Sequence, residues 1–244
     1  MGINETLLEE QLIWEKIIYK PFLEGKEGVI SVPFSLGVTE EYLASDKRLM
    51  IVGQETDDFG TNYDGWKLTA IQEWDIKYLE QQLYRKHSDE FKYNKSPFWQ
   101  FFRYLEKDGF VPCWNNVDKA HMYENGHTKA LPYEYEYLLS APYESEHGYY
   151  GLLKKEMIIA KPNAIVFITG PYYDESICTA FGLDKRSLVH RRPNMACPVS
   201  EIADILQLPV PALWTYHPNF LNFKGLMNQA LLDIKANLAE QYSR

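Results

Sequence analysis

The sequence predicts an α/β protein with three layers, in which helices cover both faces of a central, mainly parallel sheet of four strands. Two observations lead to this prediction. Four short apolar runs end in glycine or in polar residues, as buried parallel strands do. Segments with helical patterns separate these runs, and such alternation is typical of doubly wound sheets. The expected strands are 48–53, 109–117, 164–170 and 210–216.

Helical patterns occupy the intervals. A leucine and isoleucine stripe predicts an N-terminal helix within residues 1–24. Ser96 followed by Pro97 is a strong helix start, since serine caps helix N-termini and proline fits the first turn. Further helices are expected at 69–86, 97–107, 151–160, 199–206 and 224–240. Ligands of such sheets bind beyond the carboxyl ends of the strands, so functional residues should follow the strands.

The chain is expected to form a single α/β domain over residues 1–244, because it contains no repeat, low-complexity tract or flexible linker. Residues 121–150 are rich in tyrosine and glutamate without a clear period, which predicts an irregular insertion with turns. A protein partner would bind through this insertion.

Composition excludes several classes of protein. Hydrophobic residues make up 45% and charged residues 24%, which excludes a disordered chain. No apolar run approaches the roughly 18 residues of a membrane span, and the first residues do not resemble a signal peptide, so a cytoplasmic protein without membrane contact is expected. Cys113, Cys178 and Cys197 form no CxxC pair, so we expect reduced thiols and neither a zinc ribbon nor an iron–sulfur site.

Charge is distributed unevenly along the chain. The net charge of −9 argues against strong nonspecific binding of nucleic acid. Residues 185–232 nevertheless carry a net charge of +3, with Arg191 and Arg192 among the basic residues. This region is the expected place for phosphate contacts, although a solvated basic turn is the simpler interpretation of the two arginines.

The expected first strand is followed by an acidic loop. Gln54 and Glu55 come directly after the strand, and Asp57 and Asp58 follow. Three carboxylates in four residues position a water as a general base or collect a metal ion, and a solvated acidic turn is the alternative.

Two other strand ends carry polar residues. Asn115 and Asn116 end the second strand, and only one of them should face a ligand, because successive strand residues point in opposite directions. An amide offers both a donor and an acceptor, which suits the edge of a pyrimidine. After the fourth strand, His217 precedes a proline, and the apolar Phe220 and Leu221 follow at a turn.

These segments, in this order, resemble the motifs of the uracil-DNA glycosylase superfamily over about residues 45–240. The family has a strand followed by GQDPY, and this chain has a strand followed by Gly53-Gln54-Glu55. The family's HPSPLS motif is matched at His217, Pro218 and Leu221. An asparagine at the end of a strand between them would match Asn115.

The resemblance implies a glycosylase that needs no metal or other cofactor and acts on uracil or another altered base in single- or double-stranded DNA. Glu55 would activate water, and His217 would stabilise the departing base. Gln54 and Asn115 would contact the base, which would stack on Trp66, Tyr63 or Phe59. Leu221 would be the wedge that fills the gap of a flipped nucleotide, with Asn219, Arg191 and Arg192 contacting DNA.

The chain departs from the family at several positions. Glu55 replaces an aspartate, and Thr56-Asp57 stands in place of Pro-Tyr. Two alternatives therefore stand beside the glycosylase. One is a protein of the same fold that binds a nucleotide or a partner without catalysis. The other is a metal-dependent hydrolase that uses Glu55, Asp57 and Asp58.

Overall fold

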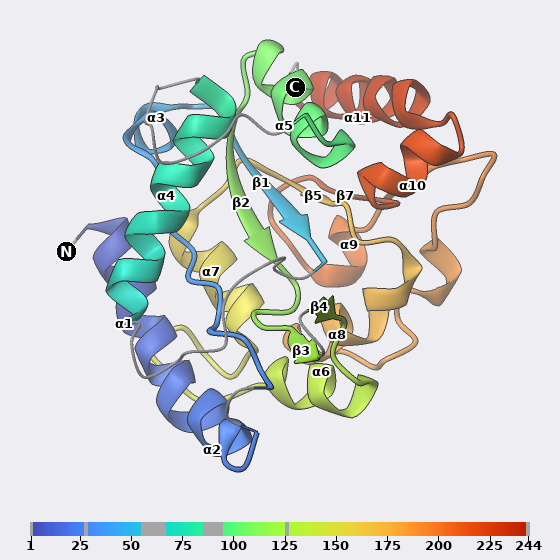
Figure 1. Cartoon of the computed structure of the whole chain (residues 1–244). Coiled ribbons are helices and arrows are strands. Elements are labelled where there is room, and N and C mark those ends of the chain that lie inside the picture. Colours follow the sequence, from blue (N-terminus) through green and yellow to red (C-terminus); the bar gives the residue numbers. More distant parts are fainter. Residues whose placement is uncertain (1, 27–28, 55–66, 85–94, 125–126, 243–244) are drawn as a thin grey trace.

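The protein is described by a computed structural model, shown in Figure 1. It describes the chain except for residues 1, 27–28, 55–66, 85–94, 125–126 and 243–244. Within the described residues, the structure is α/β with a central, mainly parallel sheet, as the sequence predicts.

The central sheet has five strands in the order β2-β1-β5-β7-β6. All neighbouring strands pair in parallel except β6, which runs antiparallel to β7. Their bounds are β1 Arg48–Gly53, β2 Val111–Asn116, β5 Ala164–Phe167, β6 Val199–Glu201 and β7 Ala212–Thr215.

The prediction of four strands was therefore wrong by one, and the helix expected at 199–206 is only partly present. Residues Val199–Glu201 form β6, and the helix α9 covers only Ala203–Leu206. A three-residue strand is too short for a hydrophobic period to identify it. It forms because β7 would otherwise leave backbone donors and acceptors unpaired at the edge of the sheet.

Helices cover both faces of the sheet. The side chain of Asn115 in β2 contacts helix α7, whereas the ring of its neighbour Trp114 contacts helix α5. Helix α1 packs against α7, and α10 and α11 pack against α5, so the two groups form separate layers (Figure 1). These helices are α1 Ile3–Trp14, α5 Pro97–Lys107, α7 Leu152–Ala160, α10 Pro218–Phe223 and α11 Met227–Tyr242. The helix α4 Leu68–Tyr84 contacts both α1 and α5.

The N-terminal region continues α1 through a π-helical turn, Glu15–Tyr19, into α2, Lys20–Leu23. The chain then passes through residues 30–39, a buried segment without regular structure that leads to α3, Glu40–Ala44. Side chains satisfy its backbone: Gln72 donates to the Leu36 carbonyl at 2.8 Å. This buried segment was not predicted, because its polar backbone partners lie far away in the sequence.

Residues 121–150 contain more regular structure than the expected irregular insertion. A hairpin of β3 (Met122–Glu124) and β4 (His127–Lys129) is followed by helix α6 (Tyr133–Leu139). Three short elements lie between β5 and β6. They are η3 Pro171–Tyr173, α8 Asp174–Ala180 and η4 Val189–Arg191. Among the described helices, none has the length and apolar character needed to cross a bilayer.

Candidate functional site at the carboxyl edge of the sheet

The carboxyl ends of β1 and β2 meet at one edge of the sheet. Gly53, the last residue of β1, is the register partner of Asn116, the last residue of β2. The end of β7 leads into Tyr216 and His217, directly before α10. Parallel strands bring these ends together, so the expected location of the site agrees with the topology (Figure 1).

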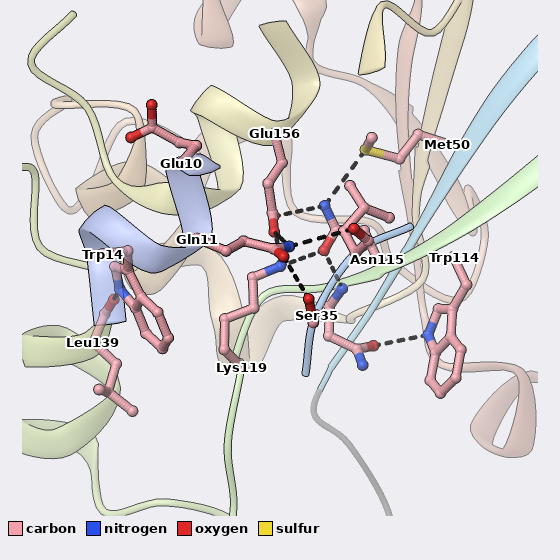
Figure 2. Close-up of polar contacts among 12 residues, drawn as sticks. Glu10, Gln11, Trp14, Ser35, Met50, Trp114, Asn115, Lys119, Leu139 and Glu156 are labelled. Atoms are coloured by element: carbon pink, nitrogen blue, oxygen red, sulfur yellow. Dashed lines mark hydrogen bonds and ion pairs between the residues drawn. The ribbon is translucent and has the colours of Figure 1, made fainter. Parts of the chain in front are cut away.

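Asn115 does not face this edge. Its side chain is fully buried on the α7 side of the sheet, where its Nδ2 donates to Glu156 Oε2 at 3.0 Å and its Oδ1 accepts a hydrogen bond from the Lys119 ammonium (Figure 2). In that view, Trp114 lies well apart from this group. The expectation that Asn115 reads a base was therefore wrong, because the alternation of the strand directs it into a buried polar cluster.

Asn116 takes the position that was expected for Asn115. Its Oδ1 accepts a hydrogen bond from the indole Nε1 of Trp114 at 3.0 Å, which fixes the orientation of the amide because an NH₂ group cannot accept. Its Nδ2 is buried and has no hydrogen-bond partner among the described residues. An unpaired buried donor costs about 1–3 kcal/mol, so this amide is suited to a ligand that supplies an acceptor.

Gly53 is required for this arrangement. A Cβ atom at Gly53 would lie 2.5 Å from Asn116 Oδ1 and 3.4 Å from the ring of Phe98. Any larger residue would displace the amide or the ring. The glycine that ends β1 thus allows Asn116 and Phe98 to approach the backbone of the strand.

Phe98 lies close to both Asn116 and His217. It lies in the first turn of α5 and is half-buried. Its ring is nearly parallel to that of His217, with centroids 5.8 Å apart and an interplanar angle of 23°, and it meets Trp114 edge-on at 5.9 Å. Phe98 thus presents an aromatic ring between the ends of β2 and β7.

His217 is held as a neutral imidazole. Burial lowers the pKa of His217 to about 4, so the ring carries no charge near neutral pH. Its Nδ1 accepts a hydrogen bond from the backbone N–H of Asn219 at 3.2 Å. The proton of the neutral ring must therefore sit on Nε2, which makes Nε2 a donor.

Asn219 and Leu221, which both follow His217 in the chain, differ in exposure to solvent. Asn219 is exposed, as a contact to DNA requires. Leu221 is fully buried in the core, so it does not project as a wedge, and this expectation was wrong. In the single turn that begins at Pro218, Leu221 lies on the inner face of α10, whereas Phe220 and Phe223 lie on the exposed face.

Arg191 and Arg192 both form ion pairs. Arg191 donates to Asp204 at 3.0 Å, and Arg192 donates to Asp174 through two nitrogens at 2.5 and 2.8 Å. A contact to phosphate would have to compete with these carboxylates.

Gln54 is held by the neighbouring strand end. Its Nε2 donates to the Thr169 carbonyl at 2.7 Å. Of the remaining predicted residues, Glu55, Tyr63 and Trp66 lie outside the described residues. Asp57, Asp58 and Phe59 lie outside them as well. Among the residues that the structure does describe, no cluster of histidine, cysteine or carboxylate side chains has the arrangement of a metal site.

A buried polar cluster supports β2 from the opposite face. Lys119 and Glu156 form a fully buried ion pair at 2.6 Å, and Gln11 of α1 donates to the other carboxylate oxygen at 2.9 Å (Figure 2). Burial lowers the pKa of Lys119, and the charge of Glu156 opposes this effect. With Asn115, these residues fix the end of β2, which positions Asn116.

Sequence reasoning did not single out Phe98, and it expected Asn115 where the structure has the amide of Asn116. To choose between the two asparagines, one must know which face of the sheet each side chain points to, and this depends on how β2 pairs with β1. The only feature of the sequence that points to Phe98 is its position directly after the Ser96-Pro97 helix start. Trp99 has almost the same position and is buried, so this feature does not distinguish the two residues. No protein-family model matches this chain, and the search of curated proteins finds no match either.

Proposed function

We propose that the protein recognises a nucleobase with Phe98, Asn116 and His217 and hydrolyses the bond between that base and its deoxyribose. This is the activity of a uracil-DNA glycosylase-like enzyme, and uracil is the proposed base. The observation that carries the proposal is that Phe98 lies beside Gly53, together with the unpaired buried amide donor of Asn116, and that its ring stacks on the neutral His217.

The donors of the site favour uracil over cytosine. Asn116 Nδ2 and His217 Nε2 are both donors, and the two carbonyl oxygens of uracil are acceptors. Cytosine has an amino group in place of one carbonyl. This amino group is itself a donor, so it could not accept a hydrogen bond from Asn116 Nδ2 or His217 Nε2. The ring of Phe98 would stack on the base, which is worth about 1–3 kcal/mol.

The proposed reaction is hydrolysis without a covalent intermediate. The bond between the base nitrogen and the sugar carbon breaks, and its electron pair stays with the base. His217 Nε2–H would stabilise the developing negative charge on the carbonyl oxygen of the base. Glu55 would accept a proton from the water that attacks the sugar carbon, as the resemblance implies. The products are free uracil and an abasic site.

The test is cleavage of uracil-containing oligonucleotides in the presence of a metal chelator, followed by alkali. Wild-type protein should yield an alkali-sensitive site, and Glu55→Gln and His217→Ala should each lower the rate by about 100-fold or more. Activity that survives both substitutions would refute the assignment. Activity that requires Mg²⁺ would indicate the metal-dependent hydrolase instead.

A second candidate is a protein that binds a nucleobase or nucleotide at the same site without cleaving it. The burial of Leu221 and the ion pairs of Arg191 and Arg192 favour this candidate, since both leave fewer groups for duplex DNA. Binding of uracil or a uridine nucleotide by folded protein that releases no base from any oligonucleotide would support it.

A further inference from the structure

Four aromatic residues line the surface next to His217, and we call them the aromatic strip: Tyr172, Tyr216, Phe220 and Phe223. Tyr172 is 87% exposed and Phe223 79% exposed, and Phe220 is 37% exposed. Large aromatic side chains at these exposures are unfavourable in water, and a cluster of them usually marks an interaction site.

Contacts link three members of the aromatic strip, Tyr216, Phe220 and Phe223. Tyr216 and Phe220 have ring centroids 4.8 Å apart. Lys224 Nζ lies 5.8 Å from the centroid of Phe220 and 5.1 Å from that of Phe223. On the other side, a Cβ atom at Gly170 would lie 3.6 Å from the Tyr216 ring, and Tyr172 follows Gly170 by two residues.

The backbone fixes both ends of the aromatic strip. Gly170 has a φ of +67°, which favours glycine, and it turns the chain from the end of β5 into Pro171–Tyr173. The Tyr216 hydroxyl donates to the Pro193 carbonyl at 2.7 Å. His217 caps α10, the helix that carries Phe220 and Phe223, so the aromatic strip is continuous with the candidate site.

We propose that the aromatic strip binds single-stranded DNA by stacking the bases that flank the target base on Tyr172, Phe220 and Phe223. This inference rests on the proposed function, since it assumes that the base at Phe98 belongs to a DNA strand. Base stacking on exposed aromatic rings is the usual way in which proteins hold single strands without reading their sequence. Lys224 lies over two of the rings, where it would contact a phosphate.

A single strand fits this surface better than a duplex does. A duplex exposes no base faces for the rings, and the leucine expected to replace a flipped nucleotide is buried. The arginines at 191 and 192 are paired with carboxylates, and the chain carries a net charge of −9. Binding should therefore depend on stacking more than on phosphate contacts, and it should depend only weakly on salt.

The experiment is fluorescence anisotropy with a labelled 12-nucleotide single strand that lacks uracil, and with the same sequence as a duplex. Wild-type protein should bind the single strand at least tenfold more tightly than the duplex. Phe223→Ala and Tyr172→Ala should each weaken single-strand binding about tenfold, whereas Tyr149→Ala, at a residue 63% exposed outside the aromatic strip, should not. Phe223→Leu should weaken binding almost as much as Phe223→Ala, because leucine has no ring to stack. Both strip residues are largely exposed, so the variants should fold normally.

The outcomes separate this inference from the proposed function. Single-strand binding that is lost in the Phe223 and Tyr172 variants supports the inference, whether or not the protein releases uracil. Equal binding of the two DNA forms, or single-strand binding unchanged in both variants, overturns it even if uracil is released. A dimer of wild-type protein that Phe223→Ala dissociates would also overturn it, since the aromatic strip would then be an interface between two copies.

Discussion

Asn115 and Asn116 are neighbours in β2, yet their amides lie on opposite faces of the sheet. Asn115 bonds to the buried Lys119–Glu156 ion pair, whereas Asn116 bonds to Trp114 and leaves its Nδ2 unpaired beside Gly53. The first amide therefore stabilises the fold, and the second is available to a ligand. Replacing each asparagine in turn by alanine therefore distinguishes an effect on folding stability from an effect on ligand binding.

We predict that Asn115→Ala and Asn116→Ala have different effects. Asn115→Ala should lower the free energy of unfolding by about 2–3 kcal/mol, because it leaves buried charged groups without a partner. Asn116→Ala should cost about 1 kcal/mol, for the loss of one bond to Trp114, and should weaken uracil binding at least tenfold. Urea denaturation and ligand titration measure the two effects, and the opposite ranking in both would contradict the assignment.

The low pKa of His217 predicts a specific pH dependence of stability. The pKa of His217 is about 4 in the folded state and 6.5 in an exposed histidine, so between these pH values the unfolded chain takes up a proton that the folded chain does not. Stability should therefore fall as the pH drops from 6.5 to 4, by at most about 3 kcal/mol from this group. His217→Asn should show a shallower fall than wild type in urea denaturation at several pH values. Parallel curves for the two proteins would mean that the histidine is not buried as described.

Phe98 should contribute to ligand binding through its ring. Phe98→Leu keeps most of the apolar volume of the side chain but removes the stacking surface beside His217. We expect about tenfold weaker binding of uracil, with a loss of stability below about 1.5 kcal/mol. Phe101→Leu is the control, because Phe101 lies on the same helix and is fully buried. A similar loss of affinity in both variants would remove Phe98 from the site.

Glu156 should be among the residues whose single substitution destabilises the chain most. Glu156→Gln removes the ion-pair partner of the buried Lys119 ammonium, which costs about 3–5 kcal/mol. The double variant Lys119→Met with Glu156→Gln should recover much of this loss, since both charges are then absent. Asp204→Asn breaks the exposed pair with Arg191 and should cost less than about 1 kcal/mol. Equal costs at the buried and exposed pairs would contradict this account.

Sequence patterns predicted the four parallel strands because each of them contains a short apolar run whose residues are mostly buried. They failed where local signals are short or ambiguous. Residues 199–201 pair with β7 only because the edge of the sheet is open there, and the helix at 133–139 has no clear apolar stripe.

The same limit applied to the candidate site. The position of His217 after a strand could be predicted because a histidine before proline at a strand end is a local feature. Phe98 could not be identified, since its neighbourhood with His217 depends on how α5 packs against α10. The burial of Leu221 likewise depends on which face of α10 contacts the core.

We propose above that Phe98, Asn116 and His217 together recognise a base with two acceptors. The most direct measurement is ligand-observed NMR of free uracil and free cytosine with wild-type protein, Asn116→Ala and Asn115→Ala, each first shown to be folded. The account predicts saturation transfer to uracil but not to cytosine, lost in Asn116→Ala and retained in Asn115→Ala. Absence of any signal with wild-type protein, or equal signals for the two bases, would contradict it.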